Sequence, residues 1–194
     1  MARLPDPASH VHHEDRAEMQ RMAAVRTHAD GRPQLAAIYV AMFNNPKVAR
    51  AVGELGERLR FQGLLPDDLR ETTILRYSAR RRADYEWAHH VRPATQAGLT
   101  AAQIEALAGD AVPADTTPAQ RAVVQAVDHI AADNEIPAEL QDALVEVVGY
   151  AGVVEIVALC GLYGLMGYMA TAFDIPVEPG LPTPPWRKED HETR

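Results

Sequence analysis

The sequence predicts an all-α protein, and three observations support this prediction. Apolar residues recur at three- and four-residue spacings along most of the chain. No alternating apolar and polar run of useful strand length is present. Proline, glycine and N-capping residues divide the periodic segments into pieces of helix length. We therefore expect a single domain in which each helix buries one apolar stripe.

The first expected helices follow one another closely from residue 33. The stripe that begins at Leu35 ends at Asn44-Asn45, and Pro46 suits the first turn of a second helix that ends near Gly63. The arginine run at 80–82 separates the third helix from the fourth, which Gly98 terminates. The expected helices span residues 35–43, 46–63, 67–81, 84–96, 100–107, 118–134, 137–148 and 153–173.

Capping residues define the later helices. Thr100 is the expected N-cap of a short helix, with Gln103 in the capping-box position, and Thr117 caps the helix after the loop at 109–117. Residues 156–173 are almost wholly apolar and reach the lower limit of length for a membrane span. Glu155 and Asp174 flank them without Lys or Arg, so we interpret them as a helix buried by its own domain and by neighbouring subunits.

The two ends of the chain lack this periodicity. Residues 1–32 are polar, and we expect a flexible N-terminal arm before a helical domain at 33–175. His10, His12 and His13 could bind a metal ion, but no Cys or Asp/Glu spacing completes a tetrahedral set, and the prediction is a solvated arm without metal. Residues 176–194 form a proline-rich tail, either free or lying on a partner subunit.

Composition excludes several classes of protein. A chain of 194 residues with 47% hydrophobic residues is long and apolar enough for one well-packed core. The net charge of −8 argues against a surface that binds nucleic acid. A single cysteine, Cys160, excludes an intramolecular disulfide and favours a reducing cytosol. The polar N-terminus has no apolar signal region, so the expected location is cytoplasmic.

Candidate chemistry gathers in residues 70–90. Glu86 and His90 lie four residues apart in a helical pattern and therefore share one helix face. Glu71 lies on the preceding helix, which the turn at 80–82 folds back beside the fourth. Two carboxylates and an imidazole could then meet in one pocket and transfer protons without a cofactor.

The same residues resemble the carboxymuconolactone decarboxylase / alkyl hydroperoxidase D superfamily. The peroxidase branch of that superfamily has the pattern E-x11-C-x2-C-x3-H, which falls here on Glu71, Ala83, Glu86 and His90. Both cysteine positions are therefore replaced. The string at 85–90, followed by Ala-Gly-Leu-Thr at 97–100, resembles the decarboxylase-like branch instead. The resemblance is strongest over 65–107 and implies a single-domain antiparallel helical bundle.

The resemblance implies a set of roles for this chain. His90 is the expected proton donor, and Glu71 is a second carboxylate that tunes or relays the proton. Glu86 either orients His90 or moves a proton itself if burial raises its pKa. The expected substrate-binding residues are Trp87, Arg76, Tyr163 and His89. Three of them have an alternative interpretation: His89 faces another direction, Arg76 suits an internal salt bridge, and Trp87 suits aromatic core.

The expected function is that of a cofactor-independent carboxy-lyase. It would use general acid–base chemistry, without metal or organic cofactor, on a small carboxylated lactone or enolisable acid from the breakdown of aromatic compounds. A non-catalytic ligand-binding or assembly protein of the same fold stays open as an alternative. A hydroperoxide reductase is a weaker one, because its thiol chemistry needs the missing cysteines. The resemblance also implies a homo-oligomer, a trimer or hexamer. The net charge and the residues that flank 156–173 argue against a nucleic-acid or membrane partner.

Overall fold

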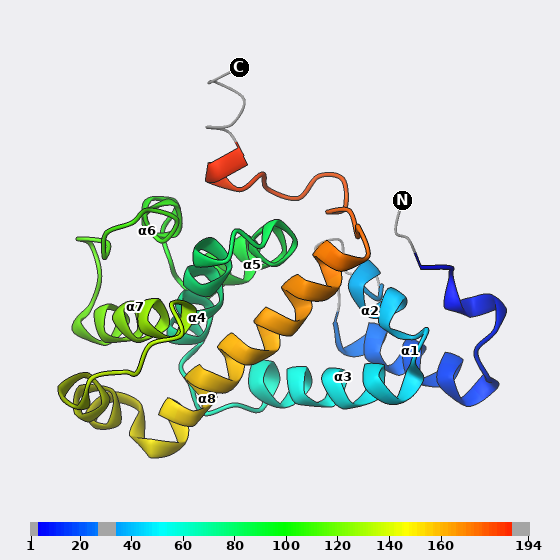
Figure 1. Ribbon diagram of the computed structural model, residues 1–194, viewed down its shortest axis with the longest axis horizontal. Helices are drawn as coiled ribbons and strands as arrows, with labels where there is room; N and C mark the ends of the chain where they lie inside the picture. The colour runs from blue at the N-terminus through cyan, green and yellow to red at the C-terminus, as the bar shows by residue number, and fades with distance from the viewer. Residues whose placement is uncertain (1–3, 27–33, 188–194) are drawn as a thin grey trace.

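The long helix α8 (Ala138–Ala172) crosses the middle of the molecule, with the other helices packed to either side of it (Figure 1). The computed structural model describes residues 4–26 and 34–187, and these contain no strand. One side holds α4 (Asp67–Arg80), α5 (Asp84–Gln96), α6 (Ala101–Ala106) and α7 (Pro118–Ala131). The other side holds α1 (His13–Val25), α2 (Ala37–Met42) and α3 (Pro46–Phe61), preceded by the short 3-10 helix η1 (Pro7–Ser9). The predicted all-α class is confirmed.

Two groups of buried side chains hold these helices together. The larger core lies around the inner face of α8 and includes Phe43, Ile74, Val123, Ile156 and Leu159. A smaller core lies between α4, α5, α6 and α7 and includes Leu75, Trp87, Leu107, Val124 and Trp186. Because α4 takes part in both cores, its residues 71–76 are all buried, including polar ones.

Helix boundaries follow the predicted caps closely. Thr100 and Thr117 each form a full capping box, with Gln103 and Gln120 as their partners. The arginine run does break the chain between α4 and α5: Arg82 has a φ of 47°, and Ala83 N donates to the Ser78 carbonyl. This turn folds α5 back along α4, which is the arrangement that the site requires.

Helix α8 is bent and only partly covered. Gly149 has a φ of 67° and interrupts the helical backbone between the two segments that the sequence predicts as separate helices. Among the described residues, α8 is the one helix that is long and apolar enough to cross a membrane, and 28% of its most apolar window is buried. Its outer face exposes apolar side chains in this single chain: Val147, Tyr150, Val154, Val157, Leu165 and Tyr168.

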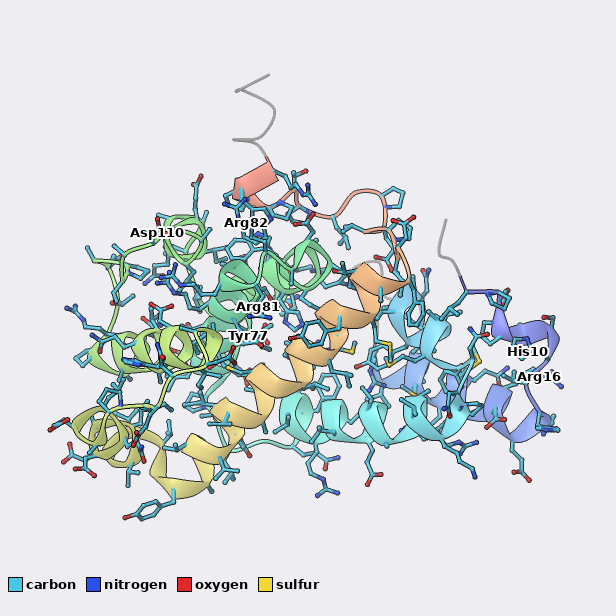
Figure 2. The ribbon with its side chains drawn as sticks, viewed as in Figure 1. His10, Arg16, Tyr77, Arg81, Arg82 and Asp110 are labelled. Atoms are coloured by element: carbon cyan, nitrogen blue, oxygen red, sulfur yellow. The ribbon has the colours of Figure 1, made fainter. Side chains whose placement is uncertain are left out.

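A glycine on α8 lets helix α4 approach closely. A Cβ atom at Gly164 would lie 2.9 Å from the Tyr77 hydroxyl. Beside this contact, an Nη atom of Arg81 donates to the Tyr168 hydroxyl at 3.1 Å, and Figure 2 labels Tyr77 and Arg81 next to α8. The small residue is required here because two helices and an aromatic ring meet at one point.

The expectation of a loose N-terminal arm is wrong for its described part. Helix α1 packs on α3 through the fully buried Met22, whose methyl group occupies the space beside Gly53. Arg21 and Arg26 both bond to Glu57 on α3. The buried Met22, the partly buried Met19 and Ala23 and a set of ion pairs hold this helix. So short an apolar set does not stand out in the hydrophobic periodicity of the sequence. Residues 27–32 of the predicted arm lie outside the described residues.

The proline-rich tail also differs from the expectation of a segment that is free or lies on a partner. Its described part crosses its own helix α5 (Figure 1). Glu178 accepts hydrogen bonds from the Ala37 backbone N–H and the Tyr85 hydroxyl, and it pairs with His89. Trp186 packs edge-on against Trp87. Residues 188–194 lie outside the described residues.

Candidate functional site

A pocket of about 660 Å³ lies where α3, α4, α5 and α8 meet. Glu71 reaches it from α4, and Glu86, His89 and His90 reach it from α5. Tyr163 on α8 forms part of its wall. The two carboxylates and the imidazole that the sequence predicts to converge therefore line one cavity.

Glu71 and His90 form a buried hydrogen-bonded pair. Glu71 Oε2 lies 2.7 Å from His90 Nδ1, and Arg70 Nε donates to the other oxygen, Oε1, at 3.1 Å. Burial opposes ionisation of Glu71, but the contact with His90 and the charges of Arg60 and Arg70 lower its pKa overall. Burial lowers the pKa of His90. We therefore describe the pair as a carboxylate that accepts a hydrogen bond from a neutral imidazole, with Nδ1 as the donor.

This pairing corrects the predicted role of Glu86 as the partner of His90. Although the two share a helix face, no hydrogen bond joins them, and the Glu86 Oε1 atom is buried without any hydrogen-bond partner among the described residues. Glu86 is only 3% exposed. Burial raises the pKa of Glu86 to about 8, against the opposing effect of Arg60. Glu86 is therefore mainly protonated at neutral pH and can donate a proton into the pocket.

Arg60 is a pocket residue that the sequence reasoning missed. It lies in the last turn of α3, and its guanidinium Cζ is 5.0 Å from the centre of the Phe61 ring. Arg60 makes no hydrogen bond or ion pair with any residue that the structure describes. No sequence signal marks it, since it stands in a helix turn beside another arginine, Arg58, which is exposed.

Two other predicted residues lie at the pocket in different settings. The Tyr163 ring stands edge-on to His90, with the ring centres 4.9 Å apart. His89 stacks on Tyr85 at 4.4 Å, and its Nε2 lies 2.7 Å from Glu178 Oε2. Tyr163 thus fixes the position of the His90 ring, whereas His89 is engaged by the C-terminal segment.

Arg76 and Trp87 do not line the pocket, which corrects their prediction as substrate-binding residues. Arg76 is fully buried and binds Asp128 through two bonds of 2.7 Å. It also donates to the carbonyl oxygens of the loop after α6, so its donors are already used. Trp87 is buried in the smaller core against Trp186. Both match the structural interpretations that the sequence left open.

The segment after α8 closes one side of the pocket. Glu178 joins the start of α2 to α5 through its bonds to Ala37, Tyr85 and His89, and Leu181 lines the cavity. Burial opposes ionisation of Glu178, but the bond to His89 and these other donors lower its pKa to about 2. The segment is therefore held by a carboxylate that stays ionised at neutral pH.

The chain offers no thiolate to this pocket. Ala83 and Glu86 stand where the peroxidase pattern has cysteines. Cys160 is buried on α8, and burial raises the pKa of its thiol to about 12. Among the described residues, no group of three or more His, Cys, Asp or Glu side chains is placed to hold a metal ion.

Comparison with known families gives a match over the centre of the chain. Residues 46–129 match the model of the carboxymuconolactone decarboxylase family. This range contains Arg60, Glu71, Glu86 and His90. No curated protein sequence matches the chain significantly.

Solved structures with a similar fold extend the match to most of the chain. A peroxidase-related protein from Ralstonia eutropha JMP134, described as an alkylhydroperoxidase AhpD core, superposes with a TM-score of 0.74 at 20% identity, covering 92% of this chain and 93% of that one. The debrominase Bmp8 in complex with 2,3,4-tribromopyrrole superposes with a TM-score of 0.71 at 18% identity, covering 93% of this chain and 94% of that one. ATU0492 from Agrobacterium tumefaciens, a protein of unknown function, superposes with a TM-score of 0.61 at 21% identity, covering 71% of this chain and 96% of that one. At these identities the likeness shows the fold.

Proposed function

We propose that this chain, whose residues 46–129 match the carboxymuconolactone decarboxylase family model and whose fold is similar to that of an alkylhydroperoxidase AhpD core protein, is a cofactor-independent acid–base enzyme of the decarboxylase type. Its substrate is a small carboxylated lactone or another enolisable carboxylic acid. The observation that carries the proposal is Glu86, a buried carboxyl group without a partner at Oε1, in the same pocket as the Glu71–His90 pair.

Glu86 has the properties of a general acid. A carboxyl group in an apolar environment keeps its proton at neutral pH and is strengthened as a donor when negative charge develops beside it. With a pKa raised by burial to about 8, Glu86 holds a proton under the conditions in which most enzymes work. We assign the proton-donor role to Glu86, where the sequence alone favoured His90.

The Glu71–His90 pair has the properties of a positioned base. Glu71 accepts from Nδ1, which leaves the lone pair of a neutral imidazole on Nε2. Nε2 makes no hydrogen bond with a described residue and can meet substrate or water. Glu71 also stabilises the imidazolium that forms when Nε2 takes up a proton.

The reaction balances with these groups alone. Cleavage of the carbon–carboxylate bond releases CO2 and leaves its electron pair on the substrate as a dienolate. Glu86 transfers its proton to the dienolate carbon and becomes a carboxylate. A proton from solvent, relayed by water and the imidazole of His90, then restores the Glu86 acid. The enzyme thus consumes one proton for each CO2 released and needs no oxidant or reductant.

Related proton transfers would use the same groups, so the reaction product decides between them. The experiment is a panel of small carboxylated lactones and unsaturated acids, with CO2 release and deuterium incorporation from D2O measured together. Decarboxylation gives stoichiometric CO2 and one deuterium at the former carboxyl carbon. Deuterium exchange without CO2 would indicate an isomerase. Absence of both across the panel, together with ligand binding, would favour the non-catalytic alternative.

The proposal includes a cytoplasmic location and assembly of identical subunits. The cytoplasm is favoured by the single thiol, which has no partner for a disulfide within the chain. Assembly is favoured by the apolar outer face of α8, which a single chain leaves open.

A further inference from the structure

We propose that Arg60 binds a carboxylate group of the ligand, and that the pocket selects flat, unsaturated carboxylates through this residue. This proposal rests on the proposed function, because it takes the same pocket to be the reaction site. It adds a residue that decides which ligands bind there. Neither the superfamily pattern at 71–90 nor the predicted substrate-binding residues includes Arg60.

The lack of a partner for Arg60 points to a missing anion. A guanidinium that is taken partly out of water normally has a carboxylate or several carbonyl groups around it. The other arginines of this fold follow that rule: Arg76 binds Asp128, Arg26 binds Glu57, and Arg70 binds Asp67 and Glu71. Arg60 is partly buried at the pocket, with the face of the Phe61 ring beside it, and its guanidinium makes no hydrogen bond or ion pair with a described residue.

The charges of the pocket leave room for an anion. Four arginines line it, together with Asp67, Glu71 and Glu86. Arg26 and Arg70 are paired, and Arg92 is exposed to solvent. Glu71 is already bonded to Arg70 and His90, and no carboxylate of the pocket forms an ion pair with Arg60. A cationic pocket in a chain of net charge −8 is therefore complementary to an anionic ligand.

The backbone just after Arg60 is anchored to α8. Arg60 lies in the last turn of α3, and the backbone N–H groups of Leu64 and Leu65, which follow that helix, donate to Glu155 on α8. The planar guanidinium matches a carboxylate through two parallel hydrogen bonds. Glu86, whose Oε1 atom has no hydrogen-bond partner among the described residues, lines the same pocket. A ligand with a carboxylate at Arg60 would present a second group to this acid.

Aromatic side chains define the shape of the ligand. Tyr39, Phe61, Tyr85 and Tyr163 all line the cavity. Their faces and edges suit a flat conjugated skeleton better than a saturated, puckered one. The chemical class is therefore a conjugated carboxylate of a few carbon atoms, whose carboxylate lies on Arg60.

Binding measurements test this assignment without any turnover. The probes are sorbate, a conjugated six-carbon carboxylate, and sorbamide, its neutral amide, titrated by calorimetry at pH 7. We expect the parent protein to prefer sorbate, and Arg60→Gln to weaken sorbate binding by about 10- to 100-fold, the usual effect of one charge-assisted hydrogen-bonded contact. Sorbamide binding should not change. Arg60→Lys keeps the charge but loses the planar guanidinium, so its affinity for sorbate should lie between those of the parent and Arg60→Gln.

Arg58→Gln is the matched control. It removes an arginine from the same last turn of α3, at a position that is 67% exposed and outside the pocket. It should leave both affinities unchanged. An equal loss of sorbate affinity in Arg58→Gln and Arg60→Gln would show that only the overall positive charge attracts sorbate, and it would overturn the assignment. So would unchanged sorbate binding in Arg60→Gln, equal affinity of the parent for the two probes, or no binding of sorbate by the parent.

Thermal unfolding separates a binding role from a structural one. Arg60→Met should melt no lower than the parent, because the cation that it removes makes no hydrogen bond or ion pair with a described residue, and the methionine side chain can keep the contact with the Phe61 ring. Sorbate should raise the melting temperature of the parent and not that of Arg60→Met. A large drop for Arg60→Met without ligand would make Arg60 a structural residue.

The two proposals can fail separately. Full turnover by Glu86→Gln, with sorbate binding still dependent on Arg60, would refute only the general-acid role. Turnover that depends on Glu86, with sorbate binding independent of Arg60, would refute only the carboxylate site.

Discussion

Glu71 on α4 and His90 on α5 join through a 2.7 Å contact between Oε2 and Nδ1, buried at the edge of the pocket. This contact crosses between helices, whereas Glu86 and His90, which share one helix face, do not bond to each other. The Glu71–His90 pair and the unpaired acid Glu86 are therefore separate groups of the site, and each can be tested by itself.

Glu71→Gln should reduce turnover while the protein stays folded. The amide keeps the volume of the side chain but removes the charge that stabilises the His90 imidazolium, so we expect kcat to fall by roughly 10- to 1000-fold. NMR titration of His90 should show a pKa lower still than in the parent, since the opposing effect of the carboxylate is gone. An unchanged His90 titration would show that Glu71 does not tune the imidazole.

His90→Ala should cost about 10²–10⁴ in turnover, the usual contribution of a positioned acid or base. Steady-state rates on a substrate that the parent converts provide the measurement, and circular dichroism should confirm an intact fold. Cys160→Ser is the matched control and should keep nearly full turnover, because no thiol takes part. Loss of activity in the cysteine variant alone would instead support thiol chemistry.

Glu86→Gln should lower kcat by about 10²–10⁴ and change KM much less. In the parent protein, activity should decline as pH rises through about 8, because the acid form of Glu86 disappears there. The pH–rate profile of kcat tests both points. A profile flat to pH 9.5 would exclude Glu86 as the proton donor.

The same group makes folding stability depend on pH. Its pKa rises from 4.5 to about 8 on folding, so between these values the folded state holds a proton that the unfolded chain does not. This contribution is complete below about pH 4.5 and is lost as pH rises through 8. It amounts to at most a few kcal/mol. Urea unfolding should show that the free energy of unfolding falls more between pH 6 and pH 9 for the parent than for Glu86→Gln. Equal decreases would contradict the shifted pKa.

Detaching the C-terminal segment should be visible by fluorescence. The chain has two tryptophans, and they contact each other between α5 and the segment. Trp186→Ala should expose Trp87, shift its emission to longer wavelength, and destabilise the fold by about 3 kcal/mol. Glu178→Gln should release the segment in part, with faster proteolysis between residues 176 and 187. Trp87 emission unchanged in Trp186→Ala would mean that the segment does not cover it.

The apolar outer face of α8 predicts a homo-oligomer, for which the family resemblance implies a trimer or hexamer. Val154 and Tyr168 are 67% and 62% exposed, in a row of apolar side chains that is costly to leave in water. Light scattering should give a multiple of 21.2 kDa. Val154→Glu should dissociate the assembly, whereas Glu146→Gln, a change on the same helix, should not. A parent mass near that of one chain would contradict this prediction.

Local physics explains what the sequence predicted well. Capping at Thr100 and Thr117, the break at Arg82 and the helix periods depend on residues within one or two turns of each other. The convergence of Glu71, Glu86 and His90 also follows from spacing once a turn between the helices is assumed. Helix α1 does not stand out in the sequence because only Met22, two partly buried neighbours and a few ion pairs hold it.

The sequence by itself determined the helical class, the match of residues 46–129 to the family and the three ionisable residues, since these depend on local spacing and on motif. Only the tertiary structure decided their roles. Because α5 packs against α4, His90 forms its hydrogen bond with Glu71. Glu86 is buried without a bond to His90, and loss of solvation raises the pKa of Glu86. The same packing takes Arg76 and Trp87 into the interior and brings Arg60, distant in sequence, to the pocket. Burial and partners are properties of the assembled helices, and no single helix contains them.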